Sequence, residues 1–313
     1  MADELGPTSP AAAPLLHVGS PMWADRRWVG TLFPAATRPG DELAVYSTWC
    51  NAVEGNTTFY ALPSPAAVDR WRTQAPPWFR FCFKLPRTVT HDRRLRNTEA
   101  PVGAFLAALE PLADRLGPLW IQLPPSFGAR DLGVLDSFLA SLQRHTGGER
   151  EEPLSWGVEV RNRAFEAEGS AERELNDLLH EHRVERVLID TRAVFAGPRV
   201  TDAEIEAFER KPRLRVRPVA IGPRPVVRFI GQTDPRANPM YWAPWVTKVA
   251  QWLNEGRSPY VFIHTPDNVA APLHAREFHA AVAEHVVGLA PLPEPLRAPA
   301  QELLFDSDAR SEC

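Results

Sequence analysis

Cysteine is scarce in this chain of 313 residues, which has only Cys50, Cys82 and Cys313. The three form no C-x-x-C pair and their number is odd, so the sequence argues against a disulfide framework and a structural zinc site. No basic and then apolar signal peptide opens the chain, and no apolar run reaches the ~18 residues that a membrane-spanning helix needs. We therefore expect a cytoplasmic protein that does not enter a membrane.

Motifs for nucleotide cofactors and for serine hydrolases are also missing. The chain has no G-x-G-x-x-G loop, no Walker-type loop and no G-x-S-x-G elbow, so no cofactor is predicted. Positive charge is not in excess either, because 35 Lys and Arg residues face 39 Asp and Glu residues and the net charge is −4. Nucleic-acid-binding proteins are usually basic, so nucleic acid is a less favoured partner than a small molecule. The sequence leaves the oligomeric state open.

The chain does have a series of short apolar runs bounded by turn signals. Runs of this kind are typical of buried strands. Eight strands are predicted in this way, at residues 15–19, 51–54, 79–84, 119–123, 155–160, 186–190, 225–230 and 260–264.

Helical stretches alternate with these runs, at residues 65–73, 101–115, 131–143, 170–183, 242–254 and 273–287. Such alternation indicates βαβ units and a parallel sheet. Eight units in a chain of this length favour an α/β fold of the TIM-like (β/α)8 barrel type over an open sheet. We expect one barrel domain over residues 14–289, between a disordered amino-terminal tail (1–13) and a Pro-rich, acidic carboxyl-terminal tail (290–313).

One stretch inside the expected domain, residues 195–224, is rich in Arg and Pro and lacks periodicity. It follows the sixth predicted strand. We interpret it as a lid or an inserted excursion, because long aperiodic loops in compact domains are usually functional.

Charged and amide residues come where the predicted strands end. The carboxyl ends of parallel strands share one side of the fold, and α/β proteins build their sites there. The placement therefore predicts a site assembled from many strand ends, but it does not name a reaction. The residues concerned are Glu54, Asn56, Lys84, Gln122, Glu159, Arg161, Asp190, Arg192, Arg228 and His264.

Several separated motifs match those of one known family. In chain order they are V-E-G-N-T-T-F-Y-A-L-P at 53–63, F-R-F-C-F-K at 79–84, T-H at 90–91, Q-L-P at 122–124, G-V-E-V-R at 157–161, R-F-I-G at 228–231 and H-T-P-D at 264–267. On these motifs the chain resembles the YecE-like family, a domain of unknown function, from about Leu16 to Glu284. The resemblance implies a TIM-like barrel with a polar cluster at its mouth and no established activity. The chain departs from many relatives at 264–268, where H-T-P-D-N replaces a paired-Asn segment.

Proton transfer is predicted for two glutamates and a histidine. The period of two in a strand puts Glu54 on one face with Asn56, and Glu159 on one face with Arg161. Glu54 is interpreted as a general base or as a ligand for a hard metal, with a buried pair to a basic neighbour as the alternative. His91 lies in the loop after the third predicted strand and is the expected proton-exchanging partner. The predicted catalytic residues are thus Glu54, Glu159 and His91.

Ligand binding is predicted mainly for cationic and amide side chains. The fork of Arg161 suits a carboxylate or a phosphate, although an internal pair with Glu54 or Asp190 is equally consistent. Lys84 is expected to bind an anion, with structural pairing or Schiff-base chemistry as alternatives. Tyr60 is a candidate wall of the pocket. The predicted ligand-binding residues are Asn56, Tyr60, Lys84, Gln122, Arg161, Asp190, Arg228 and His264.

A largely cationic pocket on an acidic protein would attract anions. We therefore expect an enzyme, such as an isomerase, lyase or hydrolase, or a ligand-binding barrel, that acts on a small phosphorylated or carboxylated metabolite by Glu/His acid–base chemistry. Two alternatives stay open: a nucleic-acid-binding or nuclease-like barrel, and a non-catalytic metabolite-binding protein. A divalent metal is less favoured, because the neighbouring Arg and Lys residues would repel a cation and no H-E-x-x-H spacing occurs.

Overall fold

A computed structural model describes residues 15–146, 153–166 and 168–297. Each of the eight predicted strands is present, and the pairs that the structure records are all parallel. The strands are β1 (His17–Gly19), β2 (Ala52–Gly55), β3 (Arg80–Phe83), β4 (Leu119–Gln122), β5 (Trp156–Glu159), β6 (Glu185–Asp190), β7 (Val226–Ile230) and β8 (Tyr260–His264).

The strands form two sheets. Six of them pair in the order β1-β8-β7-β6-β5-β4, and β2 pairs with β3. The ladder is interrupted between β1 and β2, where the amide of Glu54 donates to the carbonyl of Ser20 at 3.1 Å, and between β3 and β4, where the amide of Leu85 donates to the carbonyl of Trp120 at 2.8 Å. The predicted parallel α/β class is therefore confirmed, whereas the ladder does not run continuously through eight strands as a complete TIM barrel requires.

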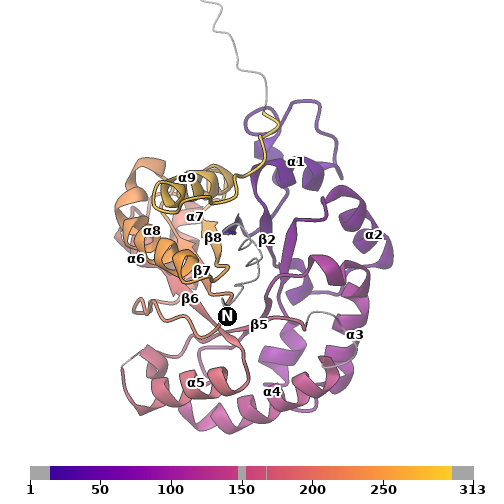
Figure 1. Cartoon of the computed structure of the whole chain (residues 1–313), viewed down its shortest axis with the longest axis vertical. Helices are drawn as coiled ribbons and strands as arrows, with labels where there is room; N and C mark the ends of the chain where they lie inside the picture. Colours follow the sequence, from indigo (N-terminus) through magenta and orange to yellow (C-terminus); the bar gives the residue numbers. More distant parts are fainter. Residues whose placement is uncertain (1–14, 147–152, 167, 298–313) are drawn as a thin grey trace, which may run out of the picture.

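Helices surround the strands and, apart from α7, follow one another around the molecule in chain order (Figure 1). They are α1 (Glu42–Trp49), α2 (Pro65–Gln74), α3 (Glu99–Leu109), α4 (Leu132–Thr146), α5 (Ser170–Glu181), α6 (Arg192–Ala196), α7 (Asp202–Arg210), α8 (Pro239–Asn254) and α9 (Ala271–Ala283). Local chemistry sets their starts. At α2, for example, the hydroxyl of Ser64 accepts from the amide of Ala67, and Pro65 occupies the first helical position. The sequence did not predict α1, α6 or α7.

The interior between the strands is filled by side chains at alternate strand positions. These side chains come from both sheets and form one buried cluster, because period-two alternation sends every second residue inward. The members are Ala52, Cys82, Trp120, Val187, Val226, Tyr260 and Phe262. The next inward positions toward the carboxyl ends of the strands lie one layer above this apolar cluster.

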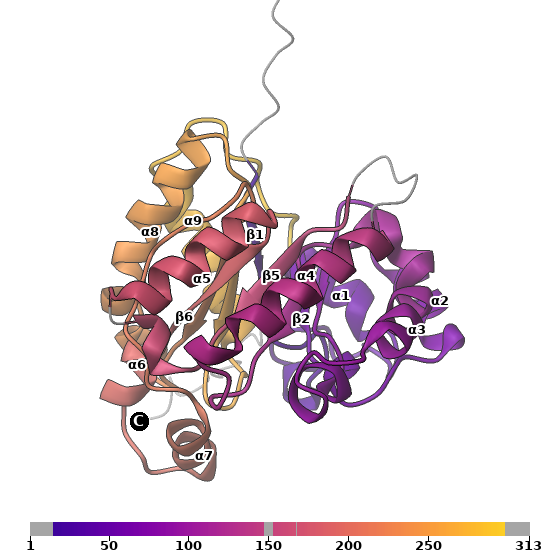
Figure 2. The same ribbon diagram turned by 90° about the horizontal axis from the view of Figure 1, so that it is seen from below.

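The segment after β6 packs over part of that upper layer. Val194 of α6 and Ala207 of α7 bury against Ile189 and Ile230, which come from β6 and β7. A capping box starts α7, since the side chain of Thr201 accepts from the amide of Glu204 and the carboxylate of Glu204 accepts in return. Figure 2 shows α7 projecting away from the other helices. We call residues 195–224 the covering segment, and the interpretation of it as a lid or an inserted excursion stays a prediction.

The expected tails differ from the structure in one respect. Residues 1–13 and 298–313 lie outside the described residues. The described part of the carboxyl-terminal tail, residues 290–297, is not loosely attached, because the amide of Leu296 donates to the hydroxyl of Thr48 at 2.9 Å. The indole of Trp49 in turn donates to the carbonyl of Leu296 at 3.1 Å. Leu296 thus contacts α1, and the predicted domain boundary at residue 289 stays a prediction.

Candidate functional site

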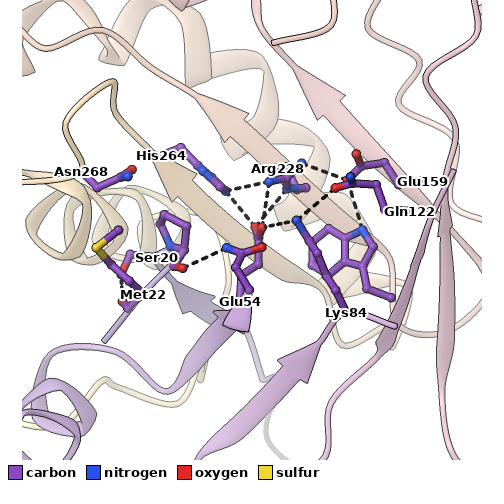
Figure 3. Close-up of polar contacts among 12 residues, drawn as sticks. Ser20, Met22, Glu54, Lys84, Gln122, Glu159, Arg228, His264 and Asn268 are labelled. Carbon is purple, nitrogen blue, oxygen red and sulfur yellow. Dashed lines mark hydrogen bonds and ion pairs between the residues drawn. The ribbon is translucent and has the colours of Figure 1, made fainter. Parts of the chain in front are cut away.

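Polar side chains form a layer directly above the apolar interior. Glu54 and Arg228, for example, each stand two residues beyond an interior apolar residue, Ala52 and Val226. Figure 3 shows such side chains from different strands pointing toward one another. We call this set the strand-end cluster: Glu54, Lys84, Gln122, Glu159, Arg161, Arg228 and His264.

Glu54 lies at the centre of the strand-end cluster and is fully buried. Arg228 donates to both of its oxygens, from Nη2 to Oε1 at 2.7 Å and from Nε to Oε2 at 2.9 Å. Lys84 Nζ lies 2.9 Å from Oε1. His264 Nε2 lies 2.8 Å from Oε2, and it must carry a proton there because a carboxylate only accepts.

Glu159 is the second buried carboxylate, and Arg228 connects it to Glu54. Arg228 Nη1 donates to Oε2 of Glu159 at 2.9 Å, and Arg161 Nε donates to Oε1 at 2.7 Å. Gln122 closes the network, because its Oε1 accepts from Lys84 Nζ at 3.1 Å and from Arg161 Nη2 at 3.0 Å. Seven of the predicted site residues, with His264 among them, are therefore joined in one hydrogen-bonded unit.

Trp120 belongs to the apolar interior and contacts this hydrogen-bonded unit. It was not among the predicted site residues. Its indole Nε1 donates to Oε2 of Glu159 at 3.1 Å. Lys84 Nζ and the guanidinium carbon of Arg228 each lie 5.3 Å from the centre of its ring, in range for cation–π attraction. The signal that would have found it is its place two residues before Gln122 on the same strand face.

Both carboxylates are held in the ionised form. Burial alone would raise the pKa of Glu54, but Arg228 and Lys84 outweigh burial and hold that pKa well below its ordinary value. At Glu159 burial is likewise outweighed, by Arg228 and Arg161, and the pKa falls to about 2. Carboxylates with such low pKa values are weak bases near neutral pH. They are suited to holding cations in position.

Two of the basic groups that contact Glu54, Lys84 and His264, lose protons more easily than usual. Burial and the neighbouring Arg228 lower the pKa of Lys84 to about 8, although Glu54 and Glu159 oppose the change. Burial also lowers the pKa of His264 to about 3, against the opposing effect of Glu54. At neutral pH His264 is therefore neutral, whereas most Lys84 side chains are charged.

Lys211 of the covering segment interacts electrostatically with the strand-end cluster. It was not among the predicted site residues. It directly follows α7, a helix that the sequence did not predict. Burial and Arg228 lower its pKa to about 8, and Glu54 opposes that shift. Its charge in turn lowers the pKa of His264. Lys211 thus lies close enough to the strand-end cluster for mutual electrostatic effects.

His91 and Tyr60 lie at the rim of the strand-end cluster. His91 belongs to a π-helical turn (Thr88–Asp92), a form that is frequent at functional sites. Burial, and after it Arg161, lowers the pKa of His91, which is half-buried. The ring of Phe59 packs edge-on against both His91 and Tyr60, with centroids 5.1 and 5.2 Å apart. Tyr60 itself is 81% exposed, so it is available to a ligand rather than to the core.

Two predicted ligand-binding residues are not brought into the strand-end cluster. Asp190 faces outward, where its carboxylate accepts from Arg192 Nη2 at 2.7 Å and from the indole of Trp245 at 2.8 Å. Asn56 lies just beyond β2 with φ −88° and ψ −15°, so the extended alternation has already ended. Its amide donates to the carbonyl of Pro21 at 2.9 Å instead. The expectation that it shares a face with Glu54 therefore fails.

The described residues were compared with the requirements of a metal site and of a membrane-spanning helix. Among residues 15–146, 153–166 and 168–297, no group of three or more His, Cys, Asp and Glu side chains is arranged to hold a metal ion. Within the same part of the chain, every helix is too short or too polar to cross a bilayer.

Comparisons with known proteins place the chain among uncharacterised relatives. The model of a family described as "Protein of unknown function DUF72" matches residues 17–298. The UPF0759 protein YecE of Escherichia coli (strain K12) is 41% identical over 259 residues, which cover 82% of this chain and 89% of that protein. The UPF0759 protein YunF of Bacillus subtilis (strain 168) is 24% identical over 157 residues, which cover 48% of this chain and 52% of that protein.

Solved structures of the same family share the fold. A DUF72 family protein from Thermotoga maritima MSB8 superposes with a TM-score of 0.62 at 20% identity, covering 85% of this chain and 98% of that one. A DUF72 family protein from Enterococcus faecalis V583 gives a TM-score of 0.60 at 17% identity, with coverage of 85% and 98%. At these identities the likeness concerns the fold alone.

Proposed function

The chain belongs to the DUF72 family, and because that family has no assigned activity, we propose from the site itself that the protein binds a small anionic metabolite, phosphorylated or carboxylated, at the strand-end cluster. We further propose that the two sheets act together as one TIM-like barrel, whose mouth is this cluster. Sites of TIM-barrel enzymes are built at that end of the strands.

An excess of buried positive charge supports this proposal. Arg228, Arg161, Lys84 and Lys211 contribute four cations near neutral pH, whereas Glu54 and Glu159 contribute two negative charges. His264 is neutral in this range. Two positive charges thus remain uncompensated in a weakly solvated environment, although the chain as a whole carries −4. A bound dianion such as a phosphate ester would balance them.

Arg161 is the cation best placed to meet the ligand. Its side chain is 19% exposed, whereas those of Lys84 and Arg228 are almost fully buried. Glu159 and Gln122 bind its Nε and Nη2 and so fix the plane of the guanidinium. Its Nη1 has no hydrogen bond to another described residue, which leaves one edge of the fork for a carboxylate or phosphate oxygen.

In this proposal His91 is the main residue that transfers protons. Glu54 and Glu159 are strongly paired, so their main contribution is to orient the cations, and their predicted role in proton transfer stays a prediction. His91 is half-buried, lies within electrostatic range of Arg161 and has a lowered pKa, so its ring is neutral near neutral pH and can accept a proton.

The test is a thermal-shift series at fixed ionic strength with inorganic phosphate, phosphosugars, small carboxylates and short single-stranded DNA. A ligand at 100 times its dissociation constant should add about 2.7 kcal/mol of stability. We expect a shift with one or more small anions. That shift should be lost in Arg161→Met and kept in Arg236→Met, which removes an exposed guanidinium paired only with Asp234.

Two results would contradict the proposal. One is a panel in which no small anion stabilises the protein more than a matched concentration of chloride. The other is a shift with DNA alone that falls steeply with salt, because this pattern indicates binding of the phosphate backbone and favours the nucleic-acid alternative.

A further inference from the structure

Lysine is rare in this chain, yet it is concentrated at the proposed anion site. Only three of the 35 Lys and Arg residues are lysines, namely Lys84, Lys211 and Lys248. Lys84 belongs to the strand-end cluster, and Lys211 lies beside it. A guanidinium in a protein does not lose its proton, whereas an ammonium can do so and then becomes a nucleophilic amine. Two of the three lysine amines of the chain therefore lie at this site, whereas nearly all basic side chains elsewhere are arginine.

The two lysines differ in what binds them. Lys84 Nζ is fixed by Glu54 at 2.9 Å and by Gln122 at 3.1 Å. The side-chain nitrogen of Lys211 has no hydrogen bond or ion pair to any residue in the described part of the chain, and the side chain is only partly exposed. Lys211 is therefore the amine that is available to a ligand.

The backbone around Lys211 is held in place over the site. The amide of Lys211 donates to the carbonyl of Ala207 at 3.0 Å, and the hydroxyl of Thr191 donates to the carbonyl of Pro212 at 3.0 Å. Beneath this segment Ile189 pairs in register with Arg228. These two hydrogen bonds thus hold the backbone at Lys211 and Pro212 beside the end of β6, the strand that pairs with β7.

The charges that act on Lys211 come from several elements. Arg228, Lys84 and Arg161 favour loss of its proton, and Glu54 opposes that loss. Burial adds to the effect of the cations, and the pKa of Lys211 falls to about 8. Reactive lysines of enzymes are activated in this way, by desolvation and by a neighbouring cation.

We propose that Lys211 is a nucleophilic amine that condenses with the carbonyl group of an anionic carbonyl compound, such as an oxo acid or a phosphorylated sugar. The proposal rests on the proposed function, because the anionic group must be held by Arg161 and its neighbours to bring the carbonyl carbon to Lys211. It narrows the ligand class from small anions to anions that carry an aldehyde or ketone.

The reaction is a condensation without change of oxidation state. The lone pair of the neutral Lys211 nitrogen forms a bond to the carbonyl carbon, and the π electron pair moves to the oxygen, which takes up a proton. The nitrogen then loses a proton, and the oxygen takes a second proton and leaves as water while the nitrogen lone pair forms the C=N bond. The nitrogen of the C=N bond then loses its remaining proton, so that amine and carbonyl compound give an imine and one water. The two protons gained by the oxygen equal the two lost by the nitrogen.

Pyridoxal 5′-phosphate is a suitable probe, because it combines an aldehyde with a phosphate. The full-length protein is incubated with the probe at pH 7.5, the imine is reduced with borohydride, and the modified peptides are quantified by mass spectrometry. A pKa of about 8 gives Lys211 a neutral fraction roughly 100-fold larger than that of an ordinary lysine. We expect Lys211 to be labelled at least tenfold faster than Lys248 and Lys84, and inorganic phosphate to slow this labelling.

Lys248 is the internal control, since it lies on α8 away from the site and donates to Gln251 at 3.0 Å. Lys211→Arg keeps the charge but cannot form an imine. It should abolish the fast labelling, whereas Lys248→Arg should change neither the labelling of Lys211 nor the thermal shift with phosphate.

The possible failures are distinguishable. If phosphate stabilises the protein and Lys211 is labelled no faster than Lys248, the inference about Lys211 is wrong and the anion site stands. If Lys211 is labelled quickly but neither phosphate nor Arg161→Met slows the labelling, the proposed anion site is wrong, and the proposed ligand class is lost with it.

Discussion

Arg228 binds both carboxylate oxygens of Glu54, at 2.7 and 2.9 Å. Arg228 belongs to β7 in the six-stranded sheet, whereas Glu54 belongs to β2 in the two-stranded sheet. This buried pair therefore connects the two sheets across the interior. It does so although no continuous backbone ladder joins the two sheets. The same polar layer therefore stabilises the fold and forms the proposed binding site.

Replacement of Arg228 by methionine should be strongly destabilising. Methionine fills much of the same volume but leaves Glu54 and Glu159 with fewer cations in a buried environment. Removing one partner of a buried ion pair typically costs about 3–5 kcal/mol. Urea unfolding monitored by tryptophan fluorescence should show this loss as a lower midpoint.

The matched control for Arg228→Met is Arg236→Met. The side chain of Arg236 is 91% exposed and 3.5 Å from Asp234, and exposed pairs of this kind are worth about 0–1 kcal/mol. Equal midpoints for Arg228→Met and the wild-type protein would show that the pair between the sheets contributes little.

The strand positions were predictable because each strand is a short apolar run that turn signals separate from its neighbours. The inward face was not predictable at β6. There Val187, Leu188 and Ile189 are all apolar, since a parallel strand is covered on both sides, and the sequence gives no alternation from which to read the face of Asp190. The structure shows Val187 inside, so Asp190 points outward to Trp245.

Two other parts of the site depend on features that periodicity does not encode. Asn56 leaves the extended conformation one residue after β2 ends, and the period of two applies only within a strand. Lys211 is placed by the packing of α7 on Ile189 and Ile230, a long-range contact made by a short helix that the sequence did not predict. By contrast, Glu54, Lys84, Gln122, Glu159, Arg228 and His264 were predictable, because each ends a run whose inward face continues into the site.

Asp190→Asn should separate stability from ligand binding. Asp190 Oδ2 accepts from Arg192 Nη2 and Trp245 Nε1, whereas Oδ1 accepts from the backbone amide and Nε of Arg192. Asparagine has only one acceptor oxygen, so the donors at the other position lose their acceptor. Such a loss costs about 1–3 kcal/mol. We expect a lower melting temperature but an unchanged dissociation constant for whichever anion binds, measured by calorimetry well below that temperature. A loss of affinity as large as that of Arg161→Met would place Asp190 in the site after all.

Glu159 should make the protein sensitive to acid. Its pKa is about 2 in the folded protein and about 4.5 when unfolded, so its stabilising contribution is fully present above pH 4.5 and disappears as the pH falls toward 2. A shift of this size corresponds to about 3 kcal/mol. The difference in unfolding free energy between the wild-type protein and Glu159→Gln should therefore shrink between pH 6 and pH 3. A difference that stays constant over this range would show that Glu159 titrates normally.

Gly19→Ala tests whether the close approach of β1 and β2 sets the position of Glu54. A Cβ atom at residue 19 would lie 2.0 Å from the carbonyl oxygen of Ala52, so the backbones of the two strands would have to separate. Overpacking of this kind typically costs about 1–3 kcal/mol. Separation would also stretch the hydrogen bond from the amide of Glu54 to the carbonyl of Ser20, and so displace the carboxylate that holds Arg228 and Lys84.

We therefore expect Gly19→Ala to lower both the melting temperature and the affinity for the anion. Gly103→Ala is the control, because Gly103 is exposed in α3 with no atom within 4 Å of a new Cβ, and alanine there should be neutral or stabilising by about 0.5–1 kcal/mol. A Gly19→Ala protein that loses stability but binds the anion with unchanged affinity would show that the strand-end cluster keeps its geometry without the tight contact between β1 and β2. The ion pairs between the sheets would then be sufficient to hold the site.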